Sequence, residues 1–170
     1  MDSAAALPHK GGMRVIKWLG AALAAVVLLW VGLDTFGGRP LDGPLGPIPG
    51  GAFVGPVSAE TAPKWDGLPE VIELEIRPSE PWSLSVWNVV IDGQLYVPSA
   101  MGARRRWTAV ALDDPRVRIR AGDQIYEQRI VRVTDPAQRQ RIGQAVAERY
   151  ELAPPDPNDD TTWFFRIEPR

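Results

Sequence analysis

The chain has 170 residues, a formal net charge of −2 and a sequence pI near 5.5. Its hydrophobic content of 45% and charged content of 24% exclude a disordered tail and a membrane protein with several spans, and its charge does not indicate nucleic-acid binding. With no cysteine and only His9, it cannot form a disulfide, a thiolate nucleophile or a lipoprotein anchor. Because His9 precedes a long apolar run, the folded part is expected to lack a Ser-His-Asp triad and ordinary zinc ligation.

An uncharged apolar run occupies residues 18–33. As a helix it would span roughly 24 Å, and flanking apolar residues extend it, so residues 15–36 are predicted to be a transmembrane anchor. Basic residues precede the run and acidic residues follow it, which predicts a cytoplasmic tail at residues 1–14 and an inner-membrane protein with its main domain outside. A cleavable signal peptide is the alternative, but no A-x-A site follows Leu33.

Residues 37–63 are expected to form a linker rich in glycine and proline. Between residues 36 and 56, seven glycines and five prolines fill 12 of 21 positions. Proline lacks a backbone donor and glycine costs backbone entropy, so this composition favours an extended tether. The alternative is that Ile48, Phe53 and Val54 dock onto the domain and order the segment.

Residues 64–170 are predicted to be the folded domain. A short helix is expected at 105–112, and a longer one begins with Asp135 as N-cap and Pro136 at its first position. Asp92-Gly93 predicts a tight hairpin turn. Alternation of apolar and polar residues predicts six strands, at 71–77, 84–91, 94–98, 116–120, 124–133 and 161–168. This order indicates an α+β fold, a small barrel or curved sheet that is mainly antiparallel.

Two charged stripes accompany these strands. Glu73 and Glu75 share one face of their strand and are expected to be solvated. The alternating arginines of the strand at 116–120 are expected to pair across the following hairpin with Glu127 and its neighbours.

The run from Trp87 to Ser99, with its Asp-Gly turn, resembles the central hairpin of the split β-barrel flavin-binding superfamily. This superfamily includes pyridoxamine-phosphate-oxidase-like proteins and deazaflavin-dependent nitroreductases. Gly102, three successive arginines and Asp114-Pro115-Arg116-Val117 follow in the order expected for that family, and the resemblance covers roughly residues 70–150. It implies a six-stranded split β-barrel with two helices, here preceded by one transmembrane helix.

The resemblance also implies a site. In that family the loop after the hairpin binds the cofactor phosphate, which makes Ser99, Arg104, Arg105 and Arg106 the candidate residues for an anionic ligand. Trp107 either packs against a flavin ring or anchors the short helix in the core, and the second interpretation is favoured. The implied cofactor is FMN or a deazaflavin, and a homodimer through the barrel is also expected. No catalytic residue and no metal ligand is identified.

Two functions are compatible with these observations. The first is a membrane-anchored split-barrel oxidoreductase or cofactor carrier that uses a flavin or deazaflavin. The second is a non-catalytic envelope module for ligand binding or protein interaction that has lost the cofactor. The segment 77–83 favours the second, because it replaces the basic, glycine-containing strand with which the family contacts its cofactor.

Overall fold

The computed structural model describes residues 42–76, 79–153, 155–156 and 159–170. The predicted cytoplasmic tail (residues 1–14) and anchor (residues 15–36) lie outside these residues. Within the described part of the chain, no helix is both long enough and apolar enough to cross a membrane.

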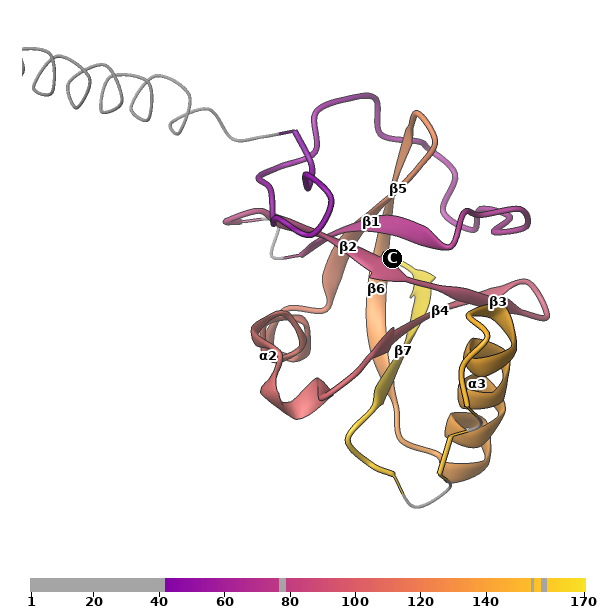
Figure 1. The fold of residues 1–170 in the computed structure, drawn as a ribbon. Coiled ribbons are helices and arrows are strands. Elements are labelled where there is room, and N and C mark those ends of the chain that lie inside the picture. Colours follow the sequence, from indigo (N-terminus) through magenta and orange to yellow (C-terminus); the bar gives the residue numbers. More distant parts are fainter. Residues whose placement is uncertain (1–41, 77–78, 154, 157–158) are drawn as a thin grey trace, which may run out of the picture. The chain divides into compact units, whose positions relative to one another are not determined.

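Seven strands form one antiparallel sheet with the order β2-β1-β5-β6-β7-β4-β3. The strands are β1 (Val71–Ile76), β2 (Trp82–Trp87), β3 (Val89–Ile91), β4 (Gln94–Ser99), β5 (Arg116–Ala121), β6 (Gln124–Val133) and β7 (Trp163–Pro169). The helices are the 3-10 turn η1 (Gly102–Arg104), α2 (Arg106–Asp113) and α3 (Pro136–Arg149). The α+β fold with a curled antiparallel sheet and two helices is therefore confirmed, and Figure 1 shows α2 and α3 at opposite sides of the sheet.

The predicted strand at 84–91 is divided at Asn88, which gives seven strands in place of six. Asn88 is fully buried, and its Nδ2 donates hydrogen bonds to the carbonyl oxygens of Pro69 (2.7 Å) and Glu70 (3.0 Å). Its backbone N–H donates to the hydroxyl of Tyr150 at 2.9 Å instead of to a strand. Because β2 and β3 lie at opposite ends of the strand order, this continuous segment belongs to both ends of the sheet, which curls into a half-barrel.

Local sequence signals place the turns and helix ends as predicted. Asp92 and Gly93 have φ values of 53° and 77°, and a tight hairpin turn with positive φ at both central residues needs this pair of residue types. The carboxylate of Asp135 accepts a hydrogen bond from the N–H of Gln138 at 2.8 Å, and Pro136 begins α3. The N-cap prediction is confirmed.

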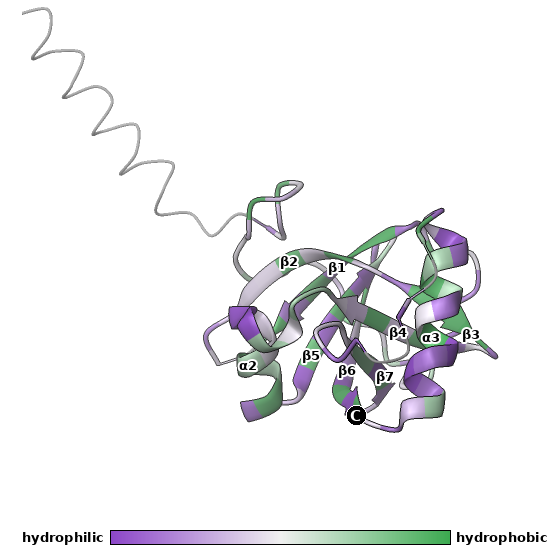
Figure 2. Cartoon of the chain, turned by 60° about the horizontal axis from the view of Figure 1, so that its bottom comes forward, coloured by the Kyte–Doolittle hydropathy of each residue, from purple (hydrophilic) through white to green (hydrophobic). Residues whose placement is uncertain are grey.

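The core lies inside the curled sheet, and α3 covers a second apolar surface. Trp107 and Ala111 from α2 pack with Phe165 of β7 inside the sheet. On the other side, Ile142 and Val146 of α3 pack in a smaller cluster of residues from β3, β4, β6 and β7. Figure 2 shows hydrophilic and hydrophobic residues alternating around α3, as expected for a helix with one face on a sheet.

Residues 42–63, here called the strap, pack on the sheet instead of extending away from it. Phe53 is only 4% exposed, whereas Ile48 and Val54 are exposed. Gly50 and Ser83 exchange backbone hydrogen bonds of 2.9 and 3.0 Å, so the strap pairs with β2, the first strand in the sheet order. Of the alternatives for this segment, docking through Phe53 is the one that the structure shows.

The strap also explains why the prediction for Glu75 was wrong. Glu75 is fully buried, and its carboxylate accepts two hydrogen bonds of 2.6 Å from the guanidinium of Arg118. The backbone N–H of Phe53 donates a third, at 2.5 Å. Arg118 therefore pairs with β1 and not, as predicted, with Glu127, which instead pairs with Arg170. The strap turns a strand face that would otherwise be solvated into a buried one.

Candidate functional site

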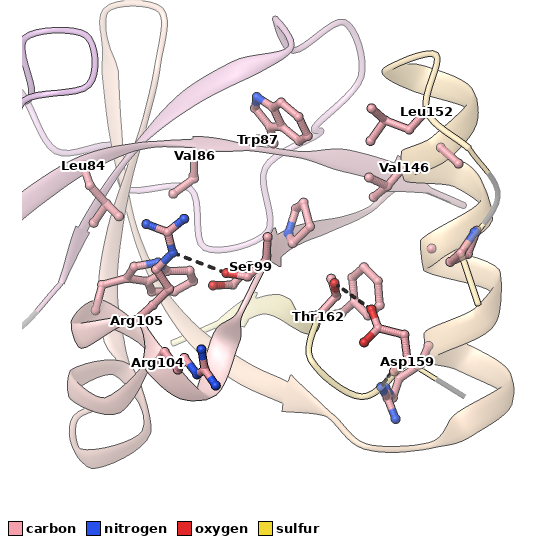
Figure 3. Close-up of a pocket in the computed structure, with 18 of the residues that line it drawn as sticks. Leu84, Val86, Trp87, Ser99, Arg104, Arg105, Val146, Leu152, Asp159 and Thr162 are labelled. Atoms are coloured by element: carbon pink, nitrogen blue, oxygen red, sulfur yellow. Dashed lines mark hydrogen bonds between the residues drawn. The ribbon is translucent and has the colours of Figure 1, made fainter. Parts of the chain in front are cut away.

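A cleft of about 850 Å³ opens between the η1–α2 segment, β2, the end of β4, α3 and the loop that leads into β7. Figure 3 shows Arg104 and Arg105 on one side of this cleft and Val146 and Asp159 on the other. Its volume falls within the range of about 300–1,000 Å³ that is usual for small-molecule and cofactor sites.

All five residues singled out in the sequence line this one cleft. Ser99 ends β4, Arg104 ends η1, Arg105 is the N-cap of α2, and Arg106 and Trp107 are the first two residues of α2. A continuous turn from strand to helix thus brings a hydroxyl, three guanidinium groups and an indole to the same wall.

The three arginines have exposed positive charges. In the part of the chain that the structure describes, no carboxylate lies within ion-pair distance of Arg104, Arg105 or Arg106. Arg105 donates from Nε to the carbonyl oxygen of Ala100 at 3.3 Å, and the guanidinium of Arg106 lies 5.5 Å from the ring centre of Trp82. Charge-assisted hydrogen bonds to an anion are open to all three.

The N-terminus of α2 adds to the positive potential of this wall. The N-cap residue Arg105 makes no side-chain capping hydrogen bond, and no acidic residue lies in the first turn. The first N–H groups of a helix lack intrahelical partners and carry partial positive charge. An anion bound at the wall would complement them.

One residue of the cleft wall has a buried hydroxyl without a hydrogen-bond partner among the described residues. Ser99 is 5% exposed, and its Oγ has no partner among the described residues. Buried polar atoms are nearly always hydrogen-bonded, so the Ser99 hydroxyl is an exception, and its oxygen is shielded from the surface of the cleft.

The turn that carries the arginines is held in place by β7 and by the loop that leads into it. Met101 has a φ of 53°, and the N–H of Gly102 donates to the carbonyl oxygen of Thr161 at 2.8 Å. A Cβ at Gly102 would lie 2.3 Å from the ring of Trp163, so only glycine fits. Gly102 therefore determines the position of the turn with Arg104, Arg105 and Arg106, here called the arginine turn, relative to the sheet.

Trp107 serves mainly as a core residue. It is 7% exposed, and its ring packs against that of Phe165, with 5.2 Å between the ring centres and 47° between the ring planes. This contact agrees with the interpretation that Trp107 anchors α2, while the exposed remainder of the indole lines the cleft.

Sequence reasoning did not identify the opposite wall, which comes from α3 and the loop before β7. Arg139 donates from Nη2 to the carbonyl oxygen of Asp159 at 2.8 Å. The carboxylate of Asp159 accepts hydrogen bonds from the hydroxyl (2.6 Å) and the N–H (2.8 Å) of Thr161, which lower its pKa. No motif in the sequence marks these residues, because folding alone brings them beside residues 99–107.

Apolar side chains complete the cleft. Leu84 and Val86 of β2 line it, together with Pro47 and Pro49 of the strap. The described residues contain no group of three or more His, Cys, Asp or Glu side chains that could hold a metal ion. The cleft therefore combines a wall of exposed arginines with apolar surface, which suits a ligand that has a negatively charged end and an apolar body.

Comparison with solved structures gives several similar chains. The conserved hypothetical protein Rv2991 from Mycobacterium tuberculosis is 24% identical, with 60% of this chain and 74% of that chain covered and a TM-score of 0.49. A putative pyridoxamine 5′-phosphate oxidase from Listeria innocua is 17% identical (60% and 85% covered, TM-score 0.48). An FAD-binding protein from Mesorhizobium loti is 17% identical (60% and 82% covered, TM-score 0.46). No curated protein matches the chain.

Comparison with protein families identifies one family that covers half of the chain. Residues 73–157, which make up half of the chain, match the family described as "Uncharacterized protein conserved in bacteria (DUF2255)". The matched segment includes the arginine turn, α2 and α3, whereas Asp159, Thr162 and Phe164 of the opposite wall follow it. The chain belongs to the DUF2255 family.

Proposed function

We propose that the cleft binds a phosphate-bearing flavin or deazaflavin, so that the protein works as a cofactor-dependent oxidoreductase or a cofactor carrier. The observation that carries this proposal is the arginine wall. Three arginines without a carboxylate partner among the described residues and an uncapped helix N-terminus meet at one cleft, which Ser99 also lines.

These groups fit the phosphate end of such a cofactor. The planar guanidinium groups of Arg104, Arg105 and Arg106 can each donate two parallel hydrogen bonds to a phosphate. The Ser99 hydroxyl would add one more donor if ligand binding opens access to its shielded oxygen. The apolar side chains of β2 and the strap suit the less polar body of the cofactor.

The chain's own side chains would bind and orient the cofactor without transferring protons at neutral pH. The folded domain contains no cysteine or histidine, so none of its side chains has an unperturbed pKa near 7. A bound flavin or deazaflavin would supply the hydride or electron transfer.

The first test is to purify the full-length chain in mild detergent, record its visible spectrum, and titrate it with FMN, FAD and a deazaflavin. Arg105→Ala and Arg106→Ala should each weaken binding of the phosphate-bearing cofactor by about 1.5–3 kcal/mol, since each removes a charge-assisted hydrogen bond. Arg141→Ala is the matched control, because Arg141 is exposed and pairs with Asp92 outside the cleft.

The outcomes separate the two functions that the sequence left open. A colourless protein that takes up none of these cofactors would contradict the proposal. If that protein still binds pyrophosphate through Arg105 and Arg106, the non-catalytic ligand-binding module is the better description. Unchanged cofactor affinity in both arginine variants would remove these residues from the site.

We also propose that residues 15–36 anchor the chain in the inner membrane, with the domain outside and residues 1–14 in the cytoplasm. The support is the apolar run and the charges that flank it. Reporter fusions at the C-terminus test this topology, and cytoplasmic reporter activity would contradict it.

A homodimer through the barrel, which the family resemblance implies, is tested by light scattering of the purified chain.

A further inference from the structure

The strap forms part of the cleft wall. It runs beside β2, where the hydroxyl of Ser83 donates to the carbonyl oxygen of Gly51 (2.7 Å) and that of Ser85 donates to Gly46 (2.8 Å). Pro47 and Pro49 lie between these contacts and line the cleft. Two rigid apolar side chains therefore border the site from a segment that precedes the family match at residues 73–157.

The strap is held by contacts that lie away from the cleft. The ring of Phe53 is buried under the guanidinium of Arg120, 4.3 Å from its centre, and the N–H of Phe53 donates to the buried Glu75. Asp42 forms an ion pair with Arg120 and accepts a hydrogen bond from the N–H of Val54 at 2.7 Å. None of these residues lines the cleft.

The strap also depends on one close backbone contact. A Cβ at Gly50 would lie 1.6 Å from the carbonyl oxygen of Gly43, and Gly43 itself has a φ of +73°. Because a backbone atom cannot move aside as a flexible side chain can, any side chain at Gly50 would force the strap out of this conformation.

We propose that the strap is an integral wall of the ligand site that positions the apolar body of the ligand, while the arginine turn holds its phosphate. This inference rests on the proposed function. It assigns Phe53, Asp42 and Gly50 as positioning residues, which act on the ligand through Pro47 and Pro49. It also predicts that ligand binding and docking of the strap stabilise each other, since coupling between two equilibria is reciprocal.

The two-part wall predicts different behaviour for two probes. Inorganic pyrophosphate has the charge of the ligand but no apolar body, so its affinity should depend on Arg105 and Arg106 and not on the strap. FMN has both parts, so its affinity should depend on both. Loss of affinity for FMN alone is a result that general destabilisation of the domain would not produce.

The experiment compares full-length wild type, Gly50→Ala and Phe53→Ala by calorimetric titration with FMN and with pyrophosphate. Both variants should bind FMN about tenfold more weakly, a loss of about 1.4 kcal/mol, with pyrophosphate affinity unchanged. Phe53→Leu, which keeps an apolar side chain at the buried position, should recover most of the FMN affinity. Gly67→Ala is the control for general destabilisation, because Gly67 lies outside the strap and its φ of +75° strains any side chain even though nothing lies close to the methyl group.

Hydrogen exchange gives the reciprocal readout. FMN should slow exchange of the backbone amides of Gly50 and Phe53 in the wild type, and pyrophosphate should not. Equal FMN affinity in wild type and Gly50→Ala, or parallel loss of both probes, would overturn the strap proposal and leave the cofactor site intact. Failure of the wild type to bind FMN would overturn the strap proposal, and failure with every flavin and deazaflavin would overturn the proposed function as well.

Discussion

Replacing Glu75 with glutamine removes one charge from the most deeply buried ion pair among the described residues. Glu75 is fully buried and the side chain of Arg118 is 19% exposed. The substitution keeps the size of the side chain but leaves the guanidinium without its counter-ion, and an amide oxygen replaces a carboxylate that accepts three hydrogen bonds. Each hydrogen bond to a charged group contributes about 1.5–3 kcal/mol.

Breaking a buried pair by removing one partner costs about 3–5 kcal/mol. Because Arg118 keeps some access to water and glutamine can still accept one hydrogen bond, we expect Glu75→Gln to lower the free energy of unfolding by about 3 kcal/mol. For a domain of this size, that loss corresponds to roughly 10–15 °C in the melting temperature. Thermal and urea unfolding of the full-length chain, followed by circular dichroism, measure both quantities.

Glu127→Gln is the matched control for this experiment. Glu127 and Arg170 form a pair of similar length, 2.9 Å, but their side chains are 47% and 43% exposed. An exposed pair contributes about 0–1 kcal/mol, so the control should unfold almost as the wild type does. If Glu75→Gln and Glu127→Gln have equal effects, the reasoning that burial under the strap makes the Glu75 pair important is refuted.

Three further predictions concern the site turn, α3 and the strap. Gly102→Ala should destabilise the domain by about 1–3 kcal/mol and weaken pyrophosphate binding, since its methyl group would meet the ring of Trp163; an unchanged melting curve would contradict this. Asp135→Ala should cost about 1 kcal/mol in urea unfolding, because the N-cap hydrogen bond is lost. The hydrogen bond from the Val54 N–H and, as the second largest cause, the hydrogen bond from Arg120 lower the pKa of Asp42. The contribution of Asp42 to strap docking is therefore present above about pH 4 and is lost at lower pH. Hydrogen exchange of strap amides should show this loss in the wild type and not in Asp42→Asn.

The local parts of the fold are predictable because neighbouring residues determine them. The Asp92-Gly93 turn needs residue types that tolerate positive φ, and the Asp135 cap needs a side-chain acceptor just ahead of Pro136. The interruption at Asn88 is different. The partners that draw its backbone and side chain out of the strand are Tyr150, Pro69 and Glu70, which lie up to 62 residues away.

For a related reason the sequence left two alternatives open for the strap, a tether or a segment docked through Ile48, Phe53 and Val54. Its composition predicts an extended chain, and glycine and proline do prevent regular secondary structure in it. What orders it is burial of one aromatic side chain, Phe53, together with hydrogen bonds to β2 and to Glu75. Alternation on β1 correctly predicts which residues share a face with Glu75, but it carries no information about what covers that face.

The cleft shows the same division between local and distant contributions. Ser99 and Arg104 to Trp107 could be named together because the family resemblance implies a phosphate-binding loop there, and the structure places them in one short turn from strand to helix. The apolar and acidic surroundings come from residues 47–49, 139–147 and 159–164, which no spacing in the sequence connects. If the cleft binds a phosphate-bearing ligand as proposed, recognition of the charge is encoded locally, whereas selection for the body of the ligand depends on the strap and on α3. Substitutions in the turn should consequently change affinity for every phosphate-bearing ligand alike, and substitutions in the strap should change which of those ligands is preferred.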